Sequence, residues 1–160
     1  MIHGIYGSSY YYFYLTLEDQ RINTAVSKNN IWHLFKFTHD LTKEVKYAYG
    51  AKNVHNDRYV KYTFAHNTTE NIFTGIIDFK PHGYWKYEVY EISWLGTLAV
   101  NDTNAPNSET EVLAVHNDNG VVQGKVEEGK LLISETAGSE QVSYTKYTEN
   151  DNTSNYLYTN

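Results

Sequence analysis

The feature of this sequence that most constrains its fold is an alternation of side chains with a period of two residues. The segment 84–92 shows it most regularly, because Trp85, Tyr87 and Val89 fall on one face while Lys86, Glu88 and Tyr90 fall on the other. Successive side chains of a β-strand point to opposite faces, so this period is typical of a half-buried strand. No window of helical length carries an apolar stripe with the 3.6-residue period of a helix. The pattern predicts an all-β protein.

Turn-forming residues divide the first part of the chain into six predicted strands. They lie at 10–17, 31–38, 45–49, 60–65, 72–79 and 84–92, with Gly75 interrupting the fifth. Strands with this spacing, separated by clusters of Asn, Gly, Pro and Ser, indicate two packed sheets. We therefore expect residues 1–95 to form an antiparallel, immunoglobulin-like β-sandwich domain.

The composition changes after residue 95. Residues 96–110 are polar and rich in turn formers, which predicts a linker, and residues 111–160 hold only short β-like pieces. The pair Asn119-Gly120 between apolar residues predicts a two-residue hairpin, and Glu127-Glu128-Gly129 is interpreted as another hairpin tip. So few core-forming residues would be marginally stable alone. We expect 111–160 to be a small β-rich extension that packs on the sandwich or on a neighbouring subunit.

Composition excludes several classes of protein. The chain has 160 residues, no cysteine, and 13 basic against 19 acidic residues, for a formal charge of −6. A disulfide framework and thiolate chemistry are therefore impossible, and duplex nucleic acid, which needs phosphate-neutralising cations, is not an expected partner. No apolar run approaches the length of about 20 residues that spans a bilayer, so no membrane partner is expected. The first residues also lack the basic and apolar regions of a secretory signal.

The sequence offers no convincing catalytic or metal-binding constellation. Glu88 and Glu91 are three residues apart on one predicted strand, which places them on opposite faces, so they cannot act as a carboxylate pair. No H-x-H pair occurs among the seven histidines, and His33 is interpreted as a core histidine satisfied by hydrogen bonds. The common nucleotide-binding and hydrolase motifs are absent from the sequence. We expect a protein that is not an enzyme and has no cofactor or metal.

The surplus of tyrosine points to a contact surface. Sixteen residues are tyrosine, and four of them stand together in one predicted strand, where they cannot all enter a single core. Tyrosine combines a large rigid ring with a polar tip and is enriched at interfaces. The candidate interface residues are Tyr10, Tyr11, Tyr12, Tyr14, Tyr156 and Tyr158. Two alternatives stay open, which are a tyrosine-rich face inside an ordinary sandwich and an aromatic platform for sugar rings.

Several segments together suggest a family. The sequences YLTLE (14–18), LFKFTHDLT (34–42), RYVKYTF (58–64) and GYWKYEVYE (83–91) resemble those of small structural proteins of tailed bacteriophages. The likeness resumes at 120–122 and 126–131, and the chain departs most from the pattern after Ser134. These segments match as a framework of strands and contain no catalytic signature.

The resemblance implies a virion component assembled in the cytoplasm of a bacterial host. Such a protein would bind other virion proteins as a capsid-decorating, neck or tail component, in several copies or as a homo-oligomer. The absence of cysteine suits assembly in a reducing compartment. The alternative function is a carbohydrate- or receptor-binding module.

Overall fold

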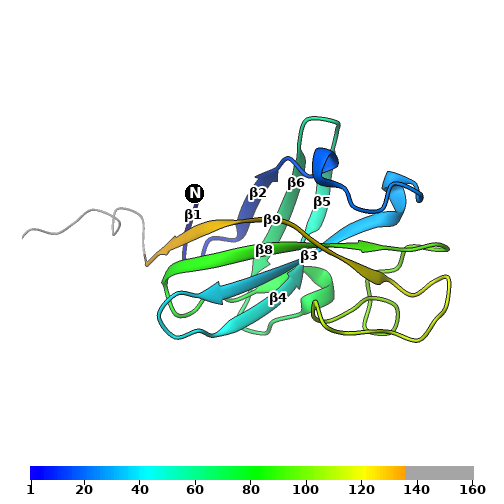
Figure 1. Ribbon diagram of the computed structural model, residues 1–160. Helices are drawn as coiled ribbons and strands as arrows, with labels where there is room; N and C mark the ends of the chain where they lie inside the picture. Colours follow the sequence, from blue (N-terminus) through cyan, green and yellow to red (C-terminus); the bar gives the residue numbers. More distant parts are fainter. Residues whose placement is uncertain (136–160) are drawn as a thin grey trace, which may run out of the picture.

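The computed structural model describes residues 1–135, and these residues form two β-sheets packed face to face (Figure 1). The larger sheet has five strands in the order β1-β9-β8-β3-β4, and the smaller sheet has the path β2-β6-β5 with β7 beside β6. The strands are β1 (Ile2–Ile5), β2 (Tyr10–Leu15), β3 (Ile31–His39), β4 (Val45–Tyr49), β5 (Ala51–His55), β6 (Val60–His66), β7 (Ile76–Ile77), β8 (Gly83–Ser93) and β9 (Val121–Ser134). Within residues 1–135 the helical elements are three single 3-10 turns, η1 (Glu18–Gln20), η2 (Lys28–Asn30) and η3 (Ile72–Thr74). The all-β class and the packing of two sheets are thus confirmed.

The main core fills the space between the sheets with aromatic rings from alternate strand positions. Phe13 of β2 lies at its centre and meets the rings of Phe35, Phe37, Phe64 and Tyr87 edge-on, at centroid distances of 5.2–5.8 Å. Edge-to-face packing places the positive ring edge against the negative face of the neighbour and adds about 0.5–1.5 kcal/mol per pair to the burial energy. This core follows the period of two, because the odd-numbered residues of β2, β3 and β8 all face inward.

A second, smaller apolar cluster lies on the outer face of the five-stranded sheet. It comprises Leu34, Tyr49, Ile92, Trp94 and Ala105. The Trp94 indole donates a hydrogen bond to the carbonyl of Asn104 (3.2 Å), and the Tyr49 hydroxyl donates one to the carbonyl of Pro106 (2.5 Å). The segment 96–110, expected as a linker, therefore lies against the sheet. The division of the chain into domains stays a prediction.

The segment after residue 110 differs locally from the expectation. Val112–Val115 form no strand and Val121 instead begins β9, which pairs with β8, so the predicted hairpin at Asn119-Gly120 is wrong. The side chains of Asp118 and Asn119 hold this loop by bonding to the Thr97 N–H and the Ala114 carbonyl. These side-chain bonds to the backbone replace the strand ladder.

The sequence Glu127-Glu128-Gly129 is also not a hairpin tip, because it lies in the middle of β9. Glu128 pairs with Glu88 and Gly129 pairs with Tyr87 of β8. A Cβ at Gly129 would stand 2.5 Å from the hydroxyl oxygen of Tyr87. The glycine is needed there so that the tyrosine ring can lie across the backbone of β9, and it marks a close approach rather than a turn.

Two further differences concern strand length and direction. The predicted strand 72–79 is divided into η3 and β7 at Gly75, whose φ of +70° belongs to the left-handed region. The pairs β1–β9 and β6–β7 are parallel, so the expectation of purely antiparallel sheets is wrong for them. The strands β1 and β5 were not predicted, because IHGI and AKNVH are short and carry little apolar alternation.

Candidate functional site

The main candidate site is a row of exposed tyrosines on the outer face of β2. Tyr10, Tyr12 and Tyr14 are 55%, 47% and 59% exposed, whereas Tyr11 is only 3% exposed and lies in the core. The burial of β2 alternates strictly, so the strand buries one face and presents the other to solvent. The candidate surface thus keeps three of the four tyrosines predicted from this strand. Tyr156 and Tyr158 lie outside the described residues.

Two residues that were not singled out from the sequence extend this row, which we call the tyrosine face. Lys61 of β6 is directly opposite Tyr14 in the strand register, and its ammonium lies 4.4 Å from the ring centroid of Tyr12 and 5.6 Å from that of Tyr14. Tyr59 lies beside Tyr14 with a centroid distance of 5.9 Å and is 39% exposed. The alternation of Val60, Tyr62 and Phe64 inward could have predicted Lys61 on the outer face, but the pairing of β2 with β6 could not be known.

The rings of the tyrosine face do not form a flat platform. Tyr10 and Tyr12 are 6.4 Å apart with an angle of 32° between their planes, and Tyr14 and Tyr59 are inclined at 52°. Within residues 1–135, Lys61 forms no ion pair with a carboxylate. The surface is therefore a ridged aromatic face with a cation in its middle, which can accept apolar side chains and a hydrogen-bonding or acidic group.

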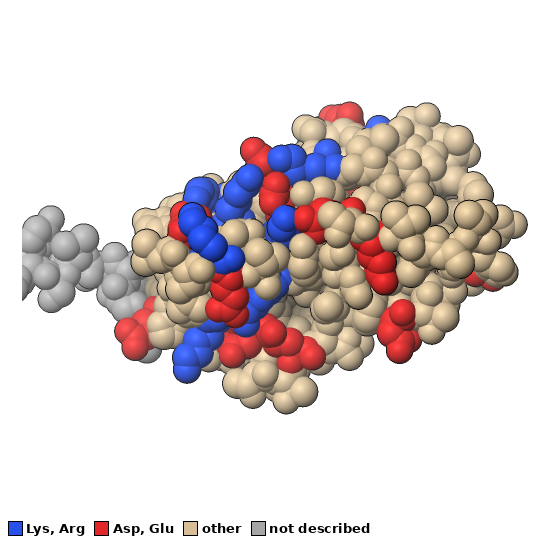
Figure 2. Space-filling view, turned by 60° about the horizontal axis from the view of Figure 1, so that its bottom comes forward, with Lys and Arg blue, Asp and Glu red and all other residues tan. Residues whose placement is uncertain are grey.

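Beside the second apolar cluster, the outer face of the five-stranded sheet carries paired charges. Lys86 forms ion pairs with Glu88 (3.4 Å) and Glu128 (3.3 Å), and Lys125 forms one with Glu128 (2.6 Å). Figure 2 shows lysine and arginine side chains interleaved with aspartate and glutamate on this side of the molecule. Charges that neutralise one another at exposed positions contribute little stability and keep a face hydrated. This face is less suited to a dry protein contact than the tyrosine face.

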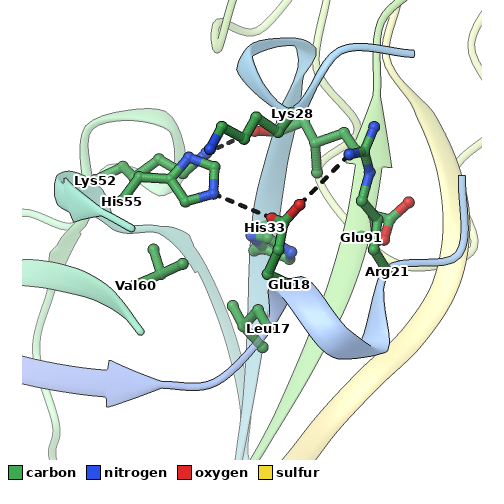
Figure 3. A pocket seen from close by; sticks show the side chains of 10 residues that line it. Leu17, Glu18, Arg21, Lys28, His33, Lys52, His55, Val60 and Glu91 are labelled. Atoms are coloured by element: carbon green, nitrogen blue, oxygen red, sulfur yellow. Dashed lines mark hydrogen bonds and ion pairs between the residues drawn. The ribbon is translucent and has the colours of Figure 1, made fainter. Parts of the chain in front are cut away.

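A second candidate is a polar cluster at one end of the sandwich (Figure 3). Glu18 of η1 accepts a hydrogen bond from His55 (3.3 Å) and lies 3.5 Å from Arg21. The carboxylate of Glu91 is fully buried, and its two oxygens accept hydrogen bonds from the backbone N–H groups of Ile22 and Asn23, both at 2.8 Å. Glu91 thereby fixes the connection between β2 and β3 to the end of β8.

Burial controls the protonation of the bases in this polar cluster. His33 is buried with its Nδ1 at 2.7 Å from the Tyr62 hydroxyl, and burial lowers the pKa of its imidazole to about 3. Burial also lowers the pKa of Lys52 to about 8, and the Lys52 ammonium donates to the carbonyl of Ile31 (3.0 Å). The pKa of His55 is lowered as well, first by burial and then by the charge of Lys52. Neutral imidazoles are thus favoured here at pH 7.

The polar cluster has no room for a substrate. The cavity between its side chains measures about 10 Å³, which is about the space of one water molecule. Both carboxylate oxygens of Glu91 accept hydrogen bonds from the backbone. Glu88 lies on the other face of β8, as the strand period predicted, and forms an ion pair with Lys86. His33 is the satisfied core histidine that the sequence predicted. The cluster is built to hold a loop in place.

A third candidate is an apolar hollow of about 380 Å³ in the loop that precedes β9. Its lining includes Leu95, Val112, Val115 and Val121, all well exposed.

Among residues 1–135, no group of three or more His, Cys, Asp or Glu side chains is arranged to hold a metal ion. No helix in the described part of the chain is long and apolar enough to cross a membrane.

Comparisons with known proteins add no relative. No family model, no curated protein and no solved structure matches the chain.

Proposed function

We propose that this chain is a non-enzymatic structural protein that acts by binding other protein chains, including further copies of itself, through its tyrosine face. The observation that supports this most is the row of Tyr10, Tyr12 and Tyr14, three large rings about half exposed on one strand. Rigid aromatic rings with polar tips give a large contact area at a low cost in conformational entropy, which is why they dominate many interfaces. A row of them on a rigid sheet is a preformed docking surface.

The setting that we propose is the virion of a tailed bacteriophage, with assembly in the host cytoplasm. The chain would be present in several copies and would bind capsid, neck or tail proteins. The supporting observations are the strand framework that resembles such proteins and the two-sheet architecture, for which we propose the immunoglobulin-like class. A stable sandwich, one hydrated charged face and one aromatic face together suit a subunit that packs among other chains.

The geometry supports a protein partner better than a sugar. A pyranose ring stacks on aromatic faces that share a plane, whereas the ring pairs of the tyrosine face are inclined at 32° and 52°. Ridges between inclined rings suit the interlocking side chains of a protein surface, where packing matches that of a protein interior.

The proposal is tested by measuring self-association of the full-length chain by sedimentation equilibrium. The substitutions Tyr10→Ser, Tyr12→Ser and Tyr14→Ser together are expected to abolish association of the chain while its circular dichroism spectrum and melting temperature stay close to those of wild type. The matched control carries Lys86→Ser, Lys125→Ser and Lys130→Ser on the charged face and is expected to associate like wild type. A wild-type chain that stays monomeric at millimolar concentration, or a triple tyrosine variant that associates normally, would refute the proposal.

A further inference from the structure

The backbone of the tyrosine face is as open as its side chains. In the antiparallel pair of β2 and β6, the His66 N–H donates to the carbonyl of Ser9, which makes these two residues a hydrogen-bonded pair. Hydrogen-bonded and non-bonded pairs alternate along an antiparallel ladder. Tyr10, Tyr12 and Tyr14 are therefore in non-bonded pairs, and their N–H and C=O groups point away from β6. The N–H of Ala65, opposite Tyr10, accordingly turns to the carbonyl of Gly75 on the other side of β6.

The outward backbone groups of β2 have no partner within residues 1–135. β2 is an edge strand that pairs with β6 on one side, and no hydrogen bond reaches its outward N–H and C=O groups in this part of the chain. A groove of about 250 Å³ adjoins the first half of this edge, between β1 and the residues Tyr10–Tyr12. Another of about 240 Å³ lies beyond its end, between Gln20 and the middle of β9. The edge is therefore bordered by open space along its first half and beyond its end.

The other edge strands of the two sheets carry the devices that prevent pairing. β5 contains a bulge between Lys52 and Val54, β1 has only four residues, and Lys46 of β4 is bonded to Glu70 and to the carbonyl of Asp78. Bulges, charges, short length and coverage are the usual protections of an edge. β2 has the sequence YYYFYL, without charge, proline or bulge, which makes it a strong template for an added strand.

We propose that residues 141–148 of a second copy of this chain add as a strand to the open edge of β2. This inference rests on the proposed function and specifies its binding mode. The chain continues for 25 residues beyond Glu135, and 141–148 reads QVSYTKYT, a run of β-formers without proline. Ser134, where β9 ends, accepts a hydrogen bond from the Tyr6 N–H, so the chain leaves β9 beside the link between β1 and β2. The proposed donor segment thus begins a few residues after the point where the chain passes the β1–β2 link, and so close to the open β2 edge of its own copy.

A second copy is a better donor than the chain itself because of the connection already present at this end. Residues 6–9 cross from β1 in one sheet to β2 in the other, directly beside Ser134. Connections at the same end of a sheet rarely cross one another, and a strand donated within one chain would have to pass this link. Donation to a neighbour is a head-to-tail contact, which produces rings or filaments of many copies. Backbone pairing and contacts of the tyrosine side chains with the added strand together supply the affinity.

The absence of cysteine makes the test direct, because any introduced thiol is the only one in its copy. Full-length chain with Tyr12→Cys is mixed with a heavier, tagged full-length copy that carries one cysteine at each position from 142 to 147 in turn. A short thiol-reactive cross-linker is added, and mixed dimers are quantified by mass. Because alternate residues of a strand lie on the same face, we expect a strong yield at every second position and a yield several-fold lower between them. The matched control replaces Tyr12→Cys by Lys86→Cys on the charged face.

Each outcome decides for or against the inference. A period-two pattern above the Lys86→Cys control supports it, and a yield at control level, or an equal yield at all positions, overturns it. Cross-linking of Tyr12→Cys copies to one another above control also overturns it, because β2 would then pair with β2. When both cysteines are placed in one chain, a cross-link that stays within the monomer overturns donation between copies. If the triple tyrosine variant loses association while no cross-link forms, this inference fails and the proposed function stands.

Discussion

His33 should make the protein lose stability in mild acid, beginning near pH 6.5, which is above the pH at which ordinary carboxylates protonate. The imidazole lies near the start of β3, buried against the Tyr62 hydroxyl, and its pKa is lowered from 6.5 to about 3, mainly by burial. The charges of Lys52 and His55 contribute to this lowering after burial. The unfolded chain therefore binds a proton at this histidine between pH 6.5 and pH 3, while the folded chain does not.

The sign and size of the effect follow from proton linkage. Stability rises with pH wherever the unfolded state binds more protons, so the contribution of His33 is complete above pH 6.5 and is lost as the pH falls towards 3. The slope approaches about 1.4 kcal/mol per pH unit within this window. Between pH 7.5 and pH 4.5 the free energy of unfolding should fall by about 2–3 kcal/mol from this group alone. That is a large part of the 5–15 kcal/mol typical of a domain.

The assay is urea unfolding followed by tryptophan fluorescence at pH 7.5, 5.5 and 4.5. Other groups titrate too, so the wild type is compared with His33→Gln, which cannot be protonated, and with Tyr62→Phe, which removes the hydrogen bond but keeps the imidazole. We expect wild type and Tyr62→Phe to lose about 2–3 kcal/mol more than His33→Gln over this range. Parallel pH profiles for wild type and His33→Gln would refute the reasoning.

Three further predictions concern stability. Glu91→Ala removes a buried carboxylate and leaves the backbone N–H groups of Ile22 and Asn23 without their acceptor, so it should cost about 2–5 kcal/mol in chemical unfolding, whereas Glu88→Ala on the solvent face should cost under about 1 kcal/mol; equal costs would contradict this assignment. Gly129→Ala places a methyl group against the Tyr87 ring and should lower the free energy of unfolding by about 1–3 kcal/mol, and an unchanged melting temperature would disprove the close packing. Tyr12→Ser should change the free energy of unfolding by under about 1 kcal/mol, because the exposed ring stabilises contacts with other chains more than it stabilises the fold. A cost of several kcal/mol would place the ring in the core.

The sequence predicts much of this fold because the apolar alternation of the long strands is strict. Counting residues puts Trp85, Tyr87 and Val89 of β8 on one face, and by the same count Phe35 and Phe37 of β3 share a face; all five are buried. Period two survives because each of these strands buries one face against the opposite sheet. The opposite-face positions of Glu88 and Glu91 follow from the same count.

The parts that the sequence did not predict depend on contacts between distant segments. In its local sequence Gly129 indicates a turn. The position has no room for a side chain because the ring of Tyr87, some forty residues earlier, lies against it. Glutamate is usually a surface residue, and the burial of Glu91 depends on hydrogen bonds from the backbone of residues 22–23, which belong to the connection between β2 and β3. Long-range geometry of this kind leaves no periodic signal in the sequence.

The candidate surface shows the same division between what is local and what is distant. The alternation of Tyr10, Tyr12 and Tyr14 with buried neighbours can be read from β2 alone, and it places three tyrosines on an outer face. That β2 is an edge strand, and that Lys61 stands between its rings, are properties of the pairing with β6. The alternation along β2 exposes the tyrosine rings. Because β2 pairs within residues 1–135 with β6 on one side only, the backbone groups on its other side stay open.

The two outer faces of the sandwich therefore have different physical roles. On the five-stranded sheet, Lys86, Lys125 and Glu128 satisfy one another, and covering them would require desolvation of charges that are already paired. On the smaller sheet, covering Tyr10, Tyr12 and Tyr14 would remove exposed aromatic surface from water and give partners to their outward N–H and C=O groups. Burial of the aromatic surface and pairing of the backbone groups both favour association at the same strand edge. A chain that needed only to stay monomeric would gain from a lysine or a bulge in β2.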